Sequence, residues 1–305
     1  MFLIDAHNDT PYRMYFENGT LYENNFQNSI QKQKGFRTLL LYAIFFDPEK
    51  LVNFSTKQDY FDSLYGNFTK ELKKNEKHIE WVWDASSFTK SKKQQAILTV
   101  EGGSLIDSLE MIDFLWSKKI KVLTLTWNDS NLLGTSAMSK DPGGLTELGK
   151  QVLKRMNSLE MIVDLSHASE NTFWDVMEIT TKPVLVSHSN ARALCNHPRN
   201  ITDEMFFALR ENNGVLGINF YPPFLENQPQ KTNLKSVFNH IEHFLELGGE
   251  NHIGFGSDFD GVDYLPQGIT DFSSFWDIIN EMEKRNYPKN LIEKICYKNM
   301  MRILS

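Results

Sequence analysis

The sequence predicts a closed (β/α)8 barrel of the TIM type, within the α/β class. Eight short apolar runs alternate along the chain with longer stretches of helical periodicity. Most of these runs are nearly continuous in apolar residues, which is typical of parallel strands covered on both faces. Several runs end in a histidine or a carboxylate. In a closed barrel such endings meet at one face, whereas an open sheet spreads them along a line.

The predicted elements follow one another in regular alternation. Strands are predicted over residues 2–6, 38–45, 96–100, 121–126, 161–165, 183–187, 215–220 and 252–256. Helices are predicted over residues 105–116, 145–156, 202–212, 237–247, 272–285 and 289–304. Thr202 opens its helix with a side chain that can cap free N–H groups, and acidic residues follow it. No linker divides the chain, so we expect one hydrolase barrel domain over residues 1–305, with the last helix packing on it.

Composition and charge exclude several classes of protein. With 41% hydrophobic and 12% aromatic residues, the 305-residue chain can bury a large core, which argues against wholesale disorder. The formal net charge of -7, without a basic stripe, argues against a nucleic-acid partner. The two cysteines, Cys195 and Cys296, exclude a disulfide framework and favour a reducing compartment.

The start of the chain predicts a strand rather than a targeting segment. Asp5 interrupts the apolar run there, and no apolar run in the sequence reaches the length of a membrane span. We therefore expect a cytoplasmic protein with no membrane partner.

Five residues of metal-binding types stand at the carboxyl ends of predicted strands. They are His7, Asp9, Glu101, His167 and His188. The first two are spaced i and i+2 at the end of a strand, so they project to the same side and can grip one ion. Glu101 has two oxygens to share between two ions, and two glycines after it let the backbone turn sharply. Three histidines with two carboxylates suit Zn²⁺, although Mn²⁺, Co²⁺ or Fe²⁺ would also fit.

Taken alone, each of these residues has an ordinary structural interpretation. A His-x-Asp pair is usually a cap or a salt bridge, and a Glu before Gly-Gly usually marks a surface turn. Five such residues at one level of a barrel favour a metal centre instead. Two cations about 3.5–4 Å apart would acidify a shared water and polarise a carbonyl, so the pattern predicts hydrolysis of an amide or ester.

Asp258, which follows the eighth run, is the candidate to move the proton in such a hydrolysis. A structural interpretation stays open, because the segment SDFDG also resembles a turn in which Asp260 and Gly261 carry the backbone. Other histidines are predicted to lie outside the site. Those on charged helical faces are expected to face solvent: His78, His240 and His243.

At these residues the chain resembles the membrane dipeptidase (renal dipeptidase) family of zinc metallopeptidases, within the amidohydrolase-type barrels. The motifs that carry the resemblance are DAHNDTP, VEGG, LTLTWN, MIVDLSHAS, PVLVSHSNARAL, HPRNITDEMF and GFGSDFDG. The resemblance runs from IDAHNDTP at the start of the chain to the terminal NMMRIL segment, so it covers nearly all of it.

The resemblance implies roles for individual residues. His7 and Asp9 would bind the first Zn²⁺, and Glu101 would bridge two ions. His167 and His188 would bind the second. Asp258 matches the acid/base aspartate of the family. Arg199, in HPRN, matches an arginine that grips the terminal carboxylate of the substrate, a task for which the paired donors of a guanidinium are suited.

One position departs from the family pattern. After the LTLT strand the vertebrate enzymes carry a histidine that contacts the substrate, and this chain has Trp127 followed by Asn128. A tryptophan cannot coordinate or protonate, but its indole N–H can donate a hydrogen bond. We therefore expect Trp127 to bind substrate, with consequences for rate and substrate preference.

The expected activity is hydrolysis of free dipeptides, including those with a C-terminal D-residue, by a bridging metal-bound hydroxide. Two alternatives stay open. The first is another amidohydrolase activity, on N-acyl amino acids, lactones or esters. The second is a non-catalytic barrel. The expected partner is a small peptide, and because barrels of this family are often dimers, a homodimer is also left open.

Overall fold

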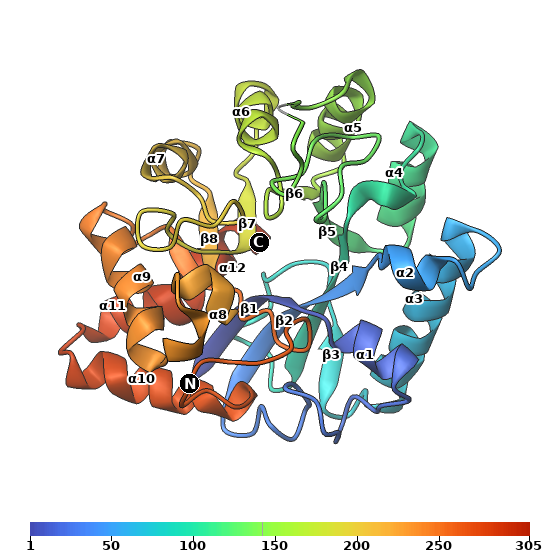
Figure 1. The fold of residues 1–305 in the computed structure, drawn as a ribbon. Helices are drawn as coiled ribbons and strands as arrows, with labels where there is room; N and C mark the ends of the chain where they lie inside the picture. Colours follow the sequence, from blue (N-terminus) through green and yellow to red (C-terminus); the bar gives the residue numbers. More distant parts are fainter. Residues whose placement is uncertain (142) are drawn as a thin grey trace.

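The computed structural model describes residues 1–141 and 143–305. Within these residues, eight parallel strands form a closed ring (Figure 1) in the order β2-β1-β9-β8-β7-β6-β5-β4, and pairing of β2 with β4 closes it. The strands are β1 (Phe2–Asn8), β2 (Arg37–Phe45), β4 (Gln94–Glu101), β5 (Ile120–Thr124), β6 (Ile162–Asp164), β7 (Leu185–Ser189), β8 (Val215–Ile218) and β9 (Ile253–Phe255). The predicted barrel is confirmed.

A ninth strand, β3 (Ile79–Trp81), was not predicted. It pairs with the first residues of β4, Gln94 to Ala96, whereas β5 pairs with the last ones, Leu98 to Glu101. β3 therefore extends the sheet at the end of the ring where the strands begin, and it does not take part in closing the ring.

The seventh strand is shifted relative to its prediction. The prediction covered residues 183–187 and left His188 outside, but β7 runs from Leu185 to Ser189 and is buried throughout. The apolar pattern stops at Val186, while the strand continues because the polar side chains that follow are satisfied by buried hydrogen bonds. His188 therefore lies within a strand, which fixes its backbone.

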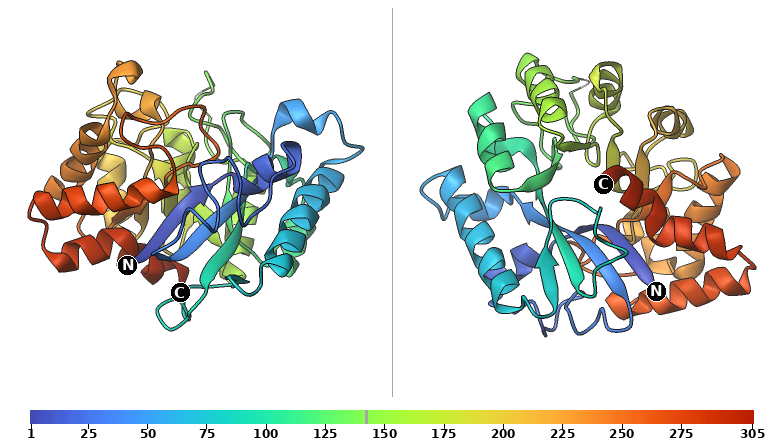
Figure 2. Two further views of the ribbon diagram at one scale, coloured as in Figure 1. Left: turned by 90° about the horizontal axis from the view of Figure 1, so that it is seen from below. Right: turned by 180° about the vertical axis from the view of Figure 1, so that it is seen from behind.

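Helices surround the ring on its outer side (Figures 1 and 2). The main ones are α1 (Thr10–Phe16), α3 (Lys57–Lys74), α4 (Leu109–Ser117), α5 (Glu147–Ser158), α6 (Glu170–Ile179), α7 (Asp203–Glu211), α9 (Leu234–Glu246), α10 (Phe275–Lys284), α11 (Lys289–Glu293) and α12 (Asn299–Leu304). Short helices α2 (Pro48–Leu51) and α8 (Pro222–Leu225) lie in loops. The prediction omitted α1, α3 and α6. The single helix predicted over residues 289–304 is continuous in the structure, with a π-helical segment (Lys294–Lys298) between α11 and α12.

Side-chain caps set where several helices begin. The predicted cap at Thr202 is confirmed, because its side chain accepts a hydrogen bond from the Met205 backbone N–H. Ser169 caps α6 in the same way through Thr172. This cap lies two residues after His167, so the start of α6 helps to define where that histidine stands.

Apolar side chains from seven strands around the ring form one cluster. Side chains from so many strands can contact one another only inside the ring, so this cluster fills the barrel interior. Met300, Ile303 and Leu304 of α12 belong to the same cluster. Because α12 contacts β1, β8 and β9, it covers the end of the barrel where the strands begin (Figure 2). The opposite end, where the strands finish, is left for the site.

His240 is a correction to the sequence prediction. It lies on α9 but is fully buried, with Nε2 donating to the Leu225 carbonyl at 2.9 Å and Nδ1 accepting from the Ala191 N–H at 3.1 Å. Its helix packs its apolar face inward, and the histidine lies on that face. His243 is half-buried and pairs with Asp203, whereas His78 is exposed as predicted.

Among the described residues, no helix combines the length and the apolar character needed to cross a bilayer.

Candidate functional site

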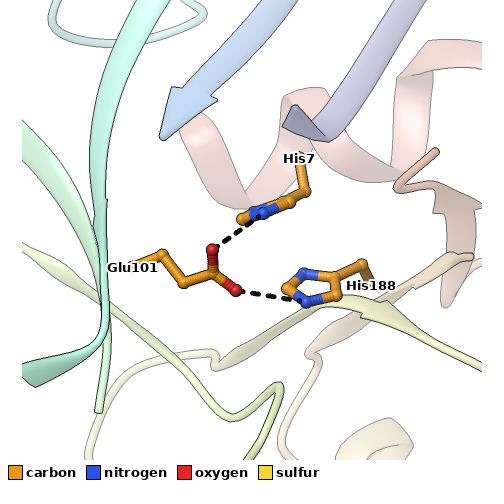
Figure 3. Close-up of side chains that lie close together, drawn as sticks. All are labelled: His7, Glu101 and His188. Carbon is orange, nitrogen blue, oxygen red and sulfur yellow. Dashed lines mark ion pairs between the residues drawn. The ribbon is translucent and has the colours of Figure 1, made fainter. Parts of the chain in front are cut away.

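The residues predicted to bind metal converge at the end of the barrel where the strands finish. His7 stands on β1, Glu101 is the last residue of β4, and His188 lies in β7 (Figure 3). Asp9 follows β1 directly, and His167 follows β6. All five are buried, with at most 6% of each exposed. The strands β1, β4 and β7 are far apart in the sequence and are not neighbours in the sheet, so only closure of the ring brings their ends together.

The Glu101 carboxylate lies between two groups of ligands. Its Oε2 is 3.4 Å from His7 Nε2, whereas its Oε1 is 2.9 Å from His167 Nε2 and 3.5 Å from His188 Nε2. Figure 3 shows His7 and His188 pointing at opposite oxygens of this carboxylate. One side chain therefore has candidate ligands beside each of its two oxygens.

Two carboxylates complete the group around His7. Its Nε2 is 3.3 Å from Asp9 Oδ2 and 3.9 Å from Asp258 Oδ1. The ligand atoms of His7, Asp9 and Asp258 all lie within 4.8 Å of one another, as do those of His7, Glu101 and His188. Asp258 is thus close enough to be a ligand as well as a proton carrier, and its geometry alone does not separate the two roles.

The donor set fits a cation. His7 Nε2 and Asp9 Oδ1 are buried and have no hydrogen-bond partner among the described residues. His167 Nε2 and His188 Nε2 face each other at 3.0 Å. Buried atoms that turn lone pairs toward one another are costly unless a shared positive charge lies between them. The arrangement therefore suits metal ligation better than hydrogen bonding.

The protonation states of His167, His188 and Glu101 also suit metal binding. Burial lowers the pKa of His167 to about 4, with a further contribution from the positive Arg199. Burial likewise holds the pKa of His188 well below its usual value, so both rings are neutral near pH 7 and can ligate. Burial alone would raise the pKa of Glu101, but the nearby His7 and His167 outweigh it and hold that pKa well below the usual range.

The backbone around His167 is held in an unusual conformation. His167 has a φ of 68°, in the left-handed region, and its carbonyl accepts a hydrogen bond from the Ala137 N–H at 2.7 Å. Its ring Nδ1 lies 3.1 Å from Asn128 Oδ1. The loop after β5 therefore holds this histidine at its backbone and at its ring, which offsets the cost of the strained φ.

Arg199 lies within reach of the same site. Its guanidinium is buried, and none of its three nitrogens has a hydrogen-bond partner among the described residues. Burial lowers the pKa of Arg199 to about 10, which leaves it charged near neutral pH. The ring of Phe224 lies 5.2 Å from its guanidinium carbon. A buried, charged and unpaired fork is a strong anion-binding group.

A cavity of about 520 Å³ joins these groups, which is a suitable size for a small ligand. Its lining includes Asp9, Glu101, His167, Arg199 and Asp258. Trp127 also lines it and packs against Phe45, with ring centroids 4.9 Å apart. Trp127, which the sequence predicted to bind substrate, is thus among the residues that line the cavity.

Asp258 and Asp260 have different surroundings. Asp258 Oδ2 accepts a hydrogen bond from Asn219 Nδ2 at 3.0 Å, while its Oδ1 faces His7. Asp260 accepts hydrogen bonds from Thr10 Oγ1 and from the Gln27 backbone N–H, both at 2.6 Å. The structural role that the sequence left open thus belongs to Asp260, which ties the segment at Gln27 to the loop after β9.

Sequence reasoning missed several residues that support the site. Asn219 follows β8 and holds Asp258, and Asp164 and Ser187 lie behind His188. A signal for Ser187 was present in the sequence, because a serine immediately precedes each of the two histidines His167 and His188. Which of these hydroxyls contacts a ring depends on strand pairing, and sequence alone does not supply that.

Comparison with known proteins supports, over the whole chain, the family resemblance seen in the sequence. The family model described as membrane dipeptidase (peptidase family M19) matches residues 1–305. An uncharacterized dipeptidase of Schizosaccharomyces pombe is 31% identical, over 99% of this chain and 79% of its own length. The chain belongs to the membrane dipeptidase family. As a member, it is a dipeptidase and a metal-dependent hydrolase, which confirms the resemblance seen in the sequence.

Solved structures of other proteins share the barrel fold. A metallopeptidase described as dipeptidase AC has a TM-score of 0.90 at 24% identity, covering 100% of this chain and 98% of its own. A Rhodobacter sphaeroides metallopeptidase, liganded with a phosphinate mimic of the dipeptide L-Ala-D-Ala, has the same TM-score, identity and coverage. At this level of identity these likenesses support the fold.

Proposed function

We propose that this dipeptidase hydrolyses free dipeptides at a centre of two Zn²⁺ ions. The observation that carries the proposal is the division of the Glu101 carboxylate, with one oxygen toward His7 and the other toward His167 and His188. His7 and Asp9 would hold the first ion, and His167 and His188 the second, with Glu101 shared. Zinc suits this mixture of imidazole and carboxylate, although Mn²⁺, Co²⁺ or Fe²⁺ would also be accepted.

Two cations in these positions would supply an acidified water and a polarised carbonyl. Asp258 would take the proton of the attacking water on Oδ1 and deliver it to the nitrogen of the leaving amine. Asn219 supports this role, because its amide holds the other oxygen of Asp258 and so fixes which oxygen faces the site. Asn219 is therefore proposed as a positioning residue for the proton transfer.

Substrate recognition is proposed to depend on Arg199 and Trp127. The unpaired guanidinium of Arg199 would bind the C-terminal carboxylate through paired hydrogen bonds. Trp127, with Phe45 behind it, would form an aromatic wall of the cavity and offer its indole N–H to the substrate. The tryptophan has no acid/base function, so proton transfer is left to Asp258.

A dipeptide with a C-terminal D-residue is proposed as a second class of substrate. The Rhodobacter metallopeptidase of the same fold holds a mimic of L-Ala-D-Ala. In this chain, Arg199 would bind the charged C-terminal carboxylate of the substrate and would not contact the side chain of the C-terminal residue. Both L-Ala-L-Ala and L-Ala-D-Ala should therefore be hydrolysed.

The decisive experiment combines metal analysis with a substrate panel. Protein purified in zinc-containing buffer should hold two equivalents, and dialysis against a chelator should abolish hydrolysis of both alanine dipeptides, with recovery on adding Zn²⁺. N-acetylated dipeptides and simple esters serve as controls for the competing amidohydrolase activity. Less than one equivalent of metal, or activity that survives chelation, would contradict the proposal.

A further inference from the structure

A buried hydrogen-bond relay lies behind His188, on the Nδ1 side of its ring. Its members are Asp164 at the end of β6 and Ser187 in β7, each only 1% exposed. Asp164 Oδ2 accepts from Ser187 Oγ at 2.5 Å and from Thr124 Oγ1 at 2.6 Å. Asp164 Oδ1 accepts from the backbone N–H groups of Ser187 at 2.8 Å and Ser166 at 3.0 Å. Four donors converge on this carboxylate, so it acts as an acceptor toward Ser187.

The relay fixes the tautomer of His188. Ser187 Oγ lies 2.7 Å from His188 Nδ1, and a hydroxyl has a single hydrogen to donate. Because that hydrogen is directed to Asp164, the hydroxyl oxygen must accept from His188, and Nδ1 must carry the proton. His188 Nε2 is then left with a lone pair, and it is the atom that faces Glu101 and His167.

The strand register builds this relay. In the sheet Asp164 is paired with Thr124 of β5 and with Leu185 of β7, so the carboxylate reaches donors on both neighbouring strands. His167 has a different anchor. Its Nδ1 faces the neutral amide oxygen of Asn128, which lines the cavity. The two histidines thus differ in the charge and burial of the groups behind them.

We propose that Asp164 and Ser187 form a positioning relay. The relay keeps the proton of His188 on Nδ1, so that Nε2 can ligate a metal, and it sets the affinity of the second metal ion. The inference rests on the proposed two-metal centre. A carboxylate behind a ligating histidine orients the ring and raises its basicity, and here a serine hydroxyl carries the effect between them. Neither Asp164 nor Ser187 touches the position of an ion, so both act through His188.

The chain contains a matched control for this relay. Asp5 accepts from the Ser257 backbone N–H at 2.7 Å and from Ser257 Oγ at 2.5 Å, the same arrangement as Asp164 and Ser187. Ser257 Oγ, however, accepts from the Phe259 backbone N–H and not from a histidine. Ser187→Ala and Ser257→Ala therefore remove equivalent buried hydroxyls, and only the first disconnects a candidate ligand.

The test is a titration of the metal-free full-length proteins with Zn²⁺ in competition with a chromophoric chelator. Wild type is expected to bind two ions. In S187A the affinity for one ion should fall about 10–100-fold while the other is retained, as is typical when support behind a ligand is lost. S257A should bind both ions as wild type does. Wild-type affinity in S187A, or an equal loss in S257A, would overturn the relay.

A second measurement does not depend on whether S187A folds. In zinc-loaded wild type with ¹⁵N-labelled histidine, the His188 ring, identified by its loss in H188Q, should show a protonated Nδ1. An unprotonated Nδ1 would overturn the inference. The two proposals fail separately. If wild type binds no metal, the metal centre itself is wrong, whereas two ions bound equally well by wild type and S187A would refute only the relay.

Discussion

At the scale of single residues, Arg199 has the clearest conflict between stability and function. Its buried guanidinium has no partner among the described residues, so the folded protein bears a desolvation cost that a substrate carboxylate would relieve. Such a residue is hard to explain by packing. Its conformation is set by neighbours, since its N–H donates to His197 and its carbonyl accepts from Ser189.

Replacing Arg199 with methionine should therefore lower activity without lowering stability. For free dipeptides, kcat/KM should fall by the equivalent of about 2–5 kcal/mol, mainly through KM, because a buried charge pair with the substrate is lost. Dipeptide amides, which lack the carboxylate, are the control and should lose far less. The free energy of unfolding should not decrease. Equal losses on both substrates in steady-state kinetics would refute the clamp.

The burial of His240 predicts that the stability of the protein depends on pH. Burial lowers its pKa from 6.5 to about 4, although its bond to the Leu225 carbonyl opposes the shift. Between these values the unfolded chain binds a proton that the folded protein excludes, so stability falls as the pH decreases. The contribution of this residue between pH 7.5 and 5 should be about 2 kcal/mol.

The measurement is urea unfolding of wild type and His240→Gln at pH 7.5 and pH 5. Glutamine does not titrate, so the variant should lose less stability than wild type on acidification. The comparison between the two proteins cancels the contribution of the other histidines. Parallel pH profiles for the two proteins would show that His240 is not protonated on unfolding.

At the scale of elements, the turn after β4 decides where Glu101 points. Gly102 has a φ of +90°, in the left-handed region that favours glycine. A Cβ added to Gly103 would lie 2.6 Å from the Leu125 carbonyl oxygen, so the chain passes closely under the end of β5. The Gly-Gly pair that the sequence offered as a sharp turn is thus required for two separate reasons.

Gly103→Ala should destabilise the protein by about 1–3 kcal/mol, because backbone must move to admit the methyl group. It should also weaken metal binding by displacing Glu101. The matched control is Gly66→Ala in α3, where an added Cβ meets nothing within 4 Å and alanine should stabilise the helix by about 0.5–1 kcal/mol. Urea unfolding and metal content measure both, and equal behaviour of the two variants would contradict the close approach.

At the scale of the whole molecule, the proposed metal ions would join strands from opposite parts of the ring. Their ligands come from β1, β4 and β7 and from the loops after β1 and β6. Because the unfolded chain keeps these ligands far apart, ions that bind only the folded state should stabilise it.

Removing the metal should therefore lower the midpoint of thermal unfolding. At a free Zn²⁺ concentration 1,000 times Kd, each ion should contribute about 4 kcal/mol, which a chelator removes. Calorimetry of the zinc-loaded and the chelated protein measures the change. A calcium-loaded sample tests for a general salt effect. An unchanged midpoint after complete removal of zinc would mean that the ligands do not bind it selectively in the folded state.

The barrel itself was predictable because its signal is local and repeated. Continuous apolar runs alternating with helical periodicity need no tertiary information to be seen. The signal fails where burial is polar. The strand through His188 continues past its apolar residues, and there the His188 backbone N–H donates to the Ser166 hydroxyl. His240 is buried on a helix that also carries charged residues, because its ring bonds to Ala191 and Leu225. These partners are distant in sequence, so no local pattern reveals them.

By itself, the sequence determined the order of the eight barrel strands, the residue types at the strand ends and the family to which the chain belongs. Only the tertiary structure decided that Glu101 divides its oxygens between two groups, that Arg199 is buried without a partner, and that Asp164 reaches His188 through Ser187. The physical reason is ring closure. Distances between strand ends depend on register and on the pairing of β2 with β4, and no local pattern encodes them.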